Sequence, residues 1–171
     1  MNYINSKNFF SLLIVFVITC SGCGYKLRSS QQGLNGQILS ISFEPNEINL
    51  NFIDELKLQG GIKRIHLNQF NKDSDIFLKV LEHSTSRYSA ALGSGARTKE
   101  ARLEYFLKIS LKKDEDQKDM ILEIRDSSIY SFDESKILAI EEIEKRIKEN
   151  FFASAISRIN FVVLNLRNED I

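Results

Sequence analysis

The strongest constraint on the fold is a strand pattern in the second half of the sequence. Over residues 103–111, apolar and polar side chains alternate, so that one face can pack while Glu104 and Lys108 meet water. A charged turn at residues 112–119 leads to a further strand-like run at residues 120–130. Two such runs joined by a short polar turn predict an antiparallel β-hairpin, whose apolar face must be covered by a second layer.

The covering layer is predicted by a long apolar stripe near the C-terminus. Ser131 and Glu134 have the spacing of a helix capping box. Apolar residues then recur every three or four positions, opposite a face of Glu, Lys and Arg. Because this stripe exceeds the average helix length, we expect a bend or break near Asn150. The stripe comprises Ile137, Ile140, Ile143, Ile147, Phe151, Ala155, Ile159 and Val162.

The first half of the domain predicts two further strands and a short helix. Residues 38–43 and 76–85 have strand-like patterns, and between them apolar residues at helical spacing follow Pro45 and end at Gly60 and Gly61. The predicted order is strand, helix, strand, strand, strand, helix. This order favours an α+β fold, a two-layer α/β sandwich in which two helices pack on one face of a four-stranded mixed or antiparallel sheet.

Composition indicates one domain without a global charge preference. The chain has 171 residues, of which 43% are hydrophobic, enough for a single core. Its 23 Lys and Arg balance 23 Asp and Glu, so no overall field attracts nucleic acid, and any electrostatic recognition must be local. We expect the sandwich domain to span residues 37–171.

The N-terminus has the pattern of an exported lipoprotein. The apolar run at residues 9–18 is shorter than the about 18 apolar residues that a permanent membrane span needs, and it suits a signal peptide. Residues 20–23 then read Cys-Ser-Gly-Cys, and the small residues before the second cysteine resemble the lipobox of bacterial lipoproteins. We expect a signal peptide over residues 1–22, a lipidated N-terminus at Cys23 and a linker through residue 36.

Two alternatives concern the cysteine pair. Cys20 lies where a lipobox usually has Leu, and it is the rival acylation site, although the preceding Thr19 is bulkier than the small residues that such a site prefers. A disulfide between Cys20 and Cys23 would close too short a loop to cross-link much. If Cys23 carries the lipid, several acyl chains anchor the domain stably, and Gly24 in place of Asp implies an outer-membrane address by analogy.

Neither a catalytic nor a metal site is predicted. His66 and His83 are the only histidines, and neither lies at ligand spacing from carboxylates. Residues 93–95 read Gly-Ser-Gly but lack the Gly-Lys-Ser/Thr ending of a phosphate loop. The remaining carboxylate pairs are interpreted as solvated: Asp114 with Asp116, and Glu141 with Glu142.

The one candidate binding site is basic. Residues 87–102 are rich in small and cationic residues, and they predict a mobile hairpin loop. Its cations could bind phosphates on a lipid or glycolipid; the alternative is a solvated edge loop. Lys136, near the start of the last predicted helix, is a weaker candidate. The four cations of the loop are Arg87, Arg97, Lys99 and Arg102.

These features together resemble a known family. Residues 23–28 read Cys-Gly-Tyr-Lys-Leu-Arg, which is similar to the opening of the LPS-assembly lipoprotein LptE family, also called RlpB. Further similarity lies in the strand, helix and Gly-Gly of residues 38–61, in Glu104-Tyr105, and in the Tyr-Ser-Phe-Asp of residues 130–133. The resemblance covers most of the mature chain.

The resemblance implies a function in the Gram-negative envelope. It implies a lipoprotein at the periplasmic face of the outer membrane that plugs the LptD β-barrel, aids the assembly of that barrel and binds lipopolysaccharide during transport. Arg97 and Lys99 occupy the loop that contacts lipopolysaccharide in the family, whereas Ile140 lies where a basic residue is expected. No catalysis and no cofactor are implied, apart from the covalent diacylglycerol and N-acyl chain, such as palmitate, on Cys23.

Two other classes of protein compete with this interpretation. One is an unrelated lipid-anchored envelope adaptor or small-ligand-binding lipoprotein. The other is a lipid-tethered hydrolase, which would need a pocket holding a perturbed pair of acids.

Overall fold

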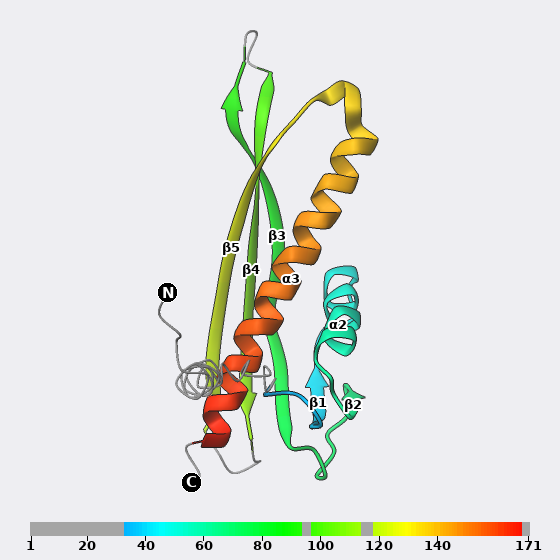
Figure 1. The fold of residues 1–171 in the computed structure, drawn as a ribbon, viewed down its shortest axis with the longest axis vertical. Helices are drawn as coiled ribbons and strands as arrows, with labels where there is room; N and C mark the ends of the chain where they lie inside the picture. Colours follow the sequence, from blue (N-terminus) through cyan, green and yellow to red (C-terminus); the bar gives the residue numbers. More distant parts are fainter. Residues whose placement is uncertain (1–32, 94–96, 114–117, 169–171) are drawn as a thin grey trace, which may run out of the picture. The chain divides into compact units, whose positions relative to one another are not determined.

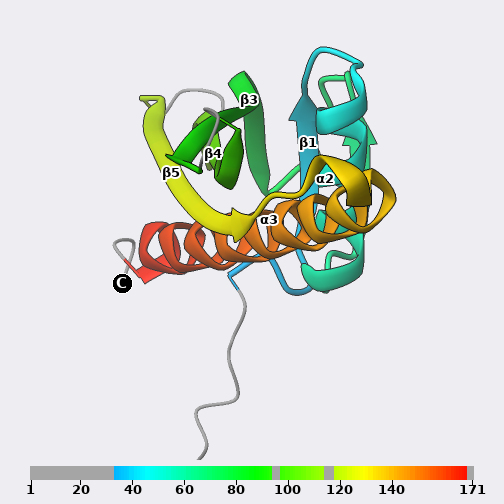
Figure 2. The same ribbon diagram turned by 90° about the horizontal axis from the view of Figure 1, so that it is seen from above.

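The computed structural model describes residues 33–93, 97–113 and 118–168. They form a five-stranded mixed sheet with two helices on one face, as Figures 1 and 2 show. The α+β class is therefore confirmed, but the sheet has five strands where four were predicted. The elements are β1 (Ile38–Ser42), α2 (Glu47–Gln59), β2 (Arg64–Leu67), β3 (Ile76–Leu92), β4 (Thr98–Lys112), β5 (Met120–Ser131), a 3-10 helix (Glu134–Lys136) and α3 (Ile137–Asn168).

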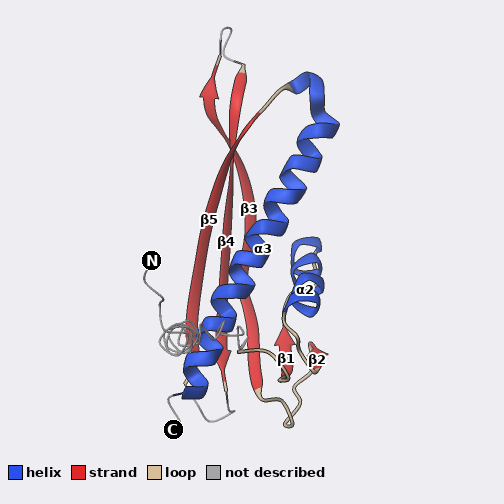
Figure 3. Cartoon of the chain, in the orientation of Figure 1, coloured by secondary structure: helices blue, strands red, loops and turns tan. Residues whose placement is uncertain are grey.

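The sheet joins a parallel part to an antiparallel part. Its strand order is β2-β1-β3-β4-β5, with β1 parallel to both β2 and β3, and with β3, β4 and β5 antiparallel in sequence order (Figure 3). The missing strand of the prediction is β2. It has four residues at the sheet edge, and its sequence Arg-Ile-His-Leu is too short to show a pattern.

Helix α2 begins and ends as the sequence predicts. The side chain of Asn46 accepts a hydrogen bond from the Asn49 N–H at 3.0 Å, which caps the first turn. At the other end, the N–H of Gly60 donates to the Leu56 carbonyl at 2.9 Å. Gly61 then takes a φ of 60°, a conformation that favours glycine and turns the chain towards β2.

The predicted basic loop is mostly strand. β3 continues to Leu92 and β4 starts at Thr98, with Ser89 opposite Ala101 and Leu92 opposite Thr98. The small polar residues in this segment do not alternate with apolar residues. Backbone pairing can nevertheless continue through them, because the buried part of the β3–β4 hairpin already fixes the register. The loop interpretation of residues 87–102 was therefore wrong for all but its tip.

A β-bulge at Leu81 changes the phase of β3. Val80 pairs with Ile109 and Glu82 pairs with Lys108, so Leu81 is an extra residue with no direct partner in β4. Leu81 is 44% exposed. From the bulge to Ser89 the odd-numbered residues face the helices, and His83 thereby enters the core.

Helix α3 is one continuous helix from residue 137 to residue 168, and the predicted break near Asn150 is absent. It contains neither Pro nor Gly, the usual causes of a kink. Ile137 and Ile143 of the predicted stripe are exposed, although Ile140 between them is buried. The buried face of α3 consists of Ile140, Phe151, Phe152, Ala155, Ile156, Ile159 and Val163.

The predicted capping box at the start of this helix was also wrong. Ser131 is the last residue of β5, and the side chain of Asp133 instead accepts a hydrogen bond from the Ser135 N–H at 3.0 Å. This caps the 3-10 helix that precedes α3. In the described part of the chain, neither helix combines the length and apolar character required to cross a membrane.

The end of the segment interpreted as a linker packs against the domain. Leu34 is fully buried, and its N–H donates to Asn160 Oδ1 at 3.1 Å. A Cβ on Gly33 would lie 2.3 Å from the carbonyl oxygen of Asn160 in α3, so only glycine fits this approach.

His83 lies at the centre of an aromatic cluster. Its ring makes edge contacts with Phe52 of α2, Tyr105 of β4 and Phe152 of α3, at centroid distances of 5.4, 5.3 and 5.8 Å. Its Nδ1 lies 2.7 Å from Oδ1 of Asn49, whereas Nε2 is buried without a hydrogen-bond partner. Burial lowers the pKa of His83 to about 4.

This pKa makes the fold sensitive to acid. The pKa of His83 is about 4 in the folded chain and near its ordinary value of 6.5 in the unfolded chain, so the unfolded chain binds the proton more readily. Stability is therefore full above pH 6.5 and falls as the pH decreases from 6.5 to 4, by about 3 kcal/mol. Denaturant unfolding at several pH values measures this slope. The His83→Gln variant should lose this part of the slope, and an unchanged slope would contradict the assignment.

Candidate functional site

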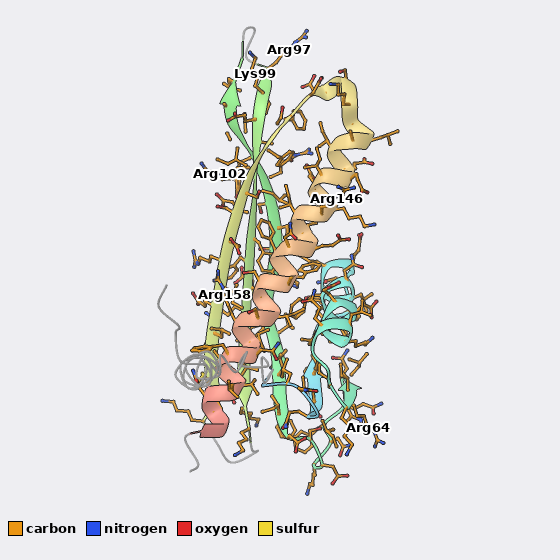
Figure 4. The ribbon with its side chains drawn as sticks, in the orientation of Figure 1. Arg64, Arg97, Lys99, Arg102, Arg146 and Arg158 are labelled. Carbon is orange, nitrogen blue, oxygen red and sulfur yellow. The ribbon has the colours of Figure 1, made fainter. Side chains whose placement is uncertain are left out.

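The predicted cations lie at four separate places on the domain. Arg97 and Lys99 lie at the tip of the β3–β4 hairpin, as Figure 4 shows. Arg102 lies on β4 between the buried Ala101 and Leu103, and its side chain therefore points to the face of the sheet that lacks helices. The structure thus brings together Arg97 and Lys99, and it separates them from the other candidates.

Arg87 links the sheet to helix α3. After the bulge in β3 it lies on the helix-facing side, where its guanidinium donates to Glu144 Oε1 at 3.0 Å. The same guanidinium lies over the ring of Phe132, 5.5 Å from the centroid. The hydrogen bond and charge of Glu144 raise the pKa of Arg87. Arg87 is therefore already paired within the protein.

Tyr130 completes this connection from β5. Its hydroxyl donates to the same Glu144 oxygen that Arg87 contacts, so that one carboxylate ties β3, β5 and α3 together. Burial, followed by this hydrogen bond, raises the pKa of Tyr130 to about 12. Sequence reasoning missed this cluster, although residues 130–133 carried part of the family resemblance. Glu144 gave no signal, because it lies in a run of exposed charges.

The hairpin tip presents two cations to solvent. Arg97 and Lys99 are exposed and have no ion-pair partner among the described residues. Leu92, which pairs with Thr98 across the hairpin, is 64% exposed. The backbone is nevertheless held: the Gly93 N–H donates to the Arg97 carbonyl at 2.7 Å, and the Phe132 N–H donates to the Lys99 carbonyl at 2.8 Å.

The other two predicted cations have acidic neighbours. Arg102 lies 3.8 Å from Glu104 on the same face of β4. Lys136 lies 3.7 Å from Asp133 in the 3-10 helix before α3, and both side chains are solvent-exposed. Pairs of this kind in water are weak, so each cation could exchange its partner for an external anion. Cys23 lies outside the described residues.

In the described part of the chain, the carboxylates form no cluster that suits a metal ion. Within the described ranges, no group of three His, Cys, Asp or Glu side chains is placed to hold a metal ion. Glu142 pairs with Arg146 at 3.1 Å on the surface of α3, whereas Asp114 and Asp116 lie outside the described residues. The carboxyl pKa values that are displaced are lowered rather than raised: Glu123 by its hydrogen bond to Lys108, and Asp133 by its hydrogen bond to Ser135.

Together, these features define a small α+β domain whose long hairpin carries two free cations at its tip. Similar folds occur among solved bacterial lipoproteins. Rare lipoprotein B from Shewanella oneidensis matches with a TM-score of 0.59 and 20% identity over 78% of this chain and 99% of its own. The uncharacterized lipoprotein B from Nitrosomonas europaea matches with a TM-score of 0.58 and 19% identity over 80% of this chain and 88% of its own.

A third solved structure agrees with these two. A minor lipoprotein from Acinetobacter baumannii has a TM-score of 0.52 and 17% identity, covering 78% of this chain and 95% of its own. Neither a family model nor a curated protein matches the sequence. The chain therefore has the fold of rare lipoprotein B, also called LptE, and the resemblance predicted from the sequence is confirmed at the level of the fold.

The pairing of Arg87 predicts that it stabilises the fold. Replacing Arg87 with Met removes one partner of Glu144 and should lower the free energy of unfolding by about 1 kcal/mol or less, because the Arg87 side chain is 53% exposed. The Arg97→Met variant, which loses no contact within the described residues, should leave it unchanged. Chemical denaturation measures both, and equal effects would show that Arg87 is as free as Arg97.

Proposed function

We propose that the protein is an outer-membrane lipoprotein, anchored at the periplasmic face through Cys23, that plugs the LptD β-barrel. In this role it aids assembly of the barrel and binds lipopolysaccharide on its way to the outer leaflet. It catalyses no reaction, and its only bound group is the acyl chains on Cys23. The observation that carries the proposal is the rare lipoprotein B fold with free cations at the hairpin tip.

The tip suits an anionic amphiphile. Phosphate groups on the glycolipid would accept hydrogen bonds from the Arg97 guanidinium and the Lys99 ammonium. Tyr88, which is 53% exposed further down β3, offers apolar surface to the acyl region. A site of this composition would recognise charge and an apolar surface together, whereas a simple phosphate site would need only the cations.

The face of the sheet without helices suits contact with a barrel wall. Among the described residues this face carries exposed apolar side chains on β5, including Ile121 and Ile129. Between them, Arg125 lies over the ring of Phe106, 4.8 Å from the centroid. Mixed apolar and polar surfaces of this kind are typical of protein interfaces.

Reversing the tip charges tests the lipopolysaccharide site. The Arg97→Glu and Lys99→Glu double variant should bind lipopolysaccharide about tenfold more weakly or worse, because two attractive charges become repulsive. Its thermal stability should not change, since neither side chain supports the fold. Affinity can be measured by surface plasmon resonance with immobilised lipopolysaccharide.

A matched control lies at the opposite end of the domain. The Lys63→Glu and Arg64→Glu double variant makes the same change in net charge on two exposed residues near β2 (Figure 4). This control should retain binding. Equal losses of lipopolysaccharide affinity in the two variants would show that binding depends on net charge. The tip would then be a solvated hairpin and not a binding site.

Depletion and co-purification test the barrel partner. Depleting the protein should leave LptD misassembled and reduce lipopolysaccharide at the cell surface. A tagged chain purified from solubilised outer membrane should retain LptD, and mass spectrometry of its N-terminus should find the acyl chains on Cys23. Normal levels of both LptD and surface lipopolysaccharide would contradict the proposal and favour an unrelated envelope adaptor.

A further inference from the structure

A groove lies between helices α2 and α3, away from the hairpin tip. It has a volume of about 810 Å³. One wall is the face of α2 that carries Ile48, Asn51, Glu55 and Leu58, at spacings of three and four residues. The other wall is a face of α3 with the same kind of spacing. Its residues on α3 include Glu141, Lys145, Lys148 and Phe152.

The groove combines apolar surface with an excess of carboxylates. Leu58 is 80% exposed although it lies on the wall of the groove, and Ile48 is only partly buried. Six acidic side chains line the groove against two lysines, whereas the whole chain has 23 of each sign. The acidic residues are Glu47, Asp54, Glu55, Glu141, Glu144 and Glu149.

Internal pairing does not cancel this negative charge. Glu144 is neutralised by Arg87 at 3.0 Å, and Asp54 by Lys57 at 2.8 Å. Four carboxylates then remain against Lys145 and Lys148, and these lysines form no ion pair within the described residues. The groove therefore keeps a local field that favours a cation.

We propose that this groove binds a cationic amphipathic helix of a partner protein. The apolar face of such a helix would cover Ile48 and Leu58, and its Lys or Arg side chains would reach the carboxylates on either wall. Two helices side by side present parallel rows of side chains into which the ridge of a third helix packs. This site is separate from the hairpin tip and does not rest on the proposed lipopolysaccharide function.

A designed peptide tests the proposal directly. The probe is a fluorescein-labelled peptide of Leu and Lys, about 15 residues long and patterned as an amphipathic helix. The target is the mature chain from residue 23 with Cys23→Ser, which retains the whole described core. Fluorescence anisotropy should show saturable binding that weakens with added salt. A peptide with Glu in place of Lys should not bind, and equal binding of the two peptides would overturn the proposal.

Variants locate the binding site. The Glu141→Lys and Glu149→Lys double variant should weaken binding of the Leu/Lys peptide about tenfold or more. The Glu82→Lys and Glu100→Lys variant makes the same charge change on exposed strand positions away from the groove, and it should bind nearly as well as the native chain. Equal losses of peptide affinity in the two variants would show an effect of net charge and would overturn the groove as the binding site.

Two further measurements distinguish binding in the groove from a change in net charge and from binding at the hairpin tip. The Leu58→Gln variant keeps every charge, and it should weaken peptide binding several-fold if the apolar wall takes part. Hydrogen exchange with bound peptide should show protection in α2 and in the first half of α3. Protection confined to the β3–β4 hairpin would overturn the proposal, whereas loss of lipopolysaccharide binding alone would leave it intact.

Discussion

The packing of helix α3 on the antiparallel strands is the interaction on which the rest of the structure depends. Phe151 stacks on Tyr105 of β4 at a centroid distance of 5.4 Å, and Phe152 contacts both Tyr105 and Phe52. Large aromatic side chains bury much apolar area, so this cluster joins sheet, α2 and α3 into one core. With that core fixed, the upper parts of the hairpin and of α3 can extend beyond it and carry functional surfaces.

The sequence predicted the elements in which burial imposes a regular spacing of apolar residues, and it failed to predict those in which burial does not. The alternation of residues 103–111 predicted strand β4, and Gly60 predicted the end of α2, because each reflects a local physical demand. β2 was missed because four residues at an edge need only backbone partners. The strand residues next to the hairpin tip, 87–92 and 98–102, were predicted as a loop for the same reason. The break expected near Asn150 was an inference from helix length, which core packing overrides.

The candidate site was predicted in part for a related reason. Composition identifies cations, but only tertiary structure tells a free cation from a paired one. Arg87 and Arg97 look equivalent in sequence, yet the phase of β3 directs Arg87 towards Glu144, while Arg97 lies at the tip in water. The groove between α2 and α3 had no sequence signal, since its carboxylates are spread over two helices that are about ninety residues apart in the chain.

The bulge at Leu81 determines which side chains of β3 point towards the helices and which point away from them. Without it, the inward and outward positions beyond Val80 would exchange, so that Glu82 would enter the aromatic core while His83 and Arg87 would face away from α3. Deleting Leu81 would therefore exchange the two faces of the β3 residues that follow it, although those residues themselves would be unchanged. The contact between Arg87 and Glu144 therefore depends on the number of residues that precede Arg87 in β3 as much as on the chemistry of the two side chains.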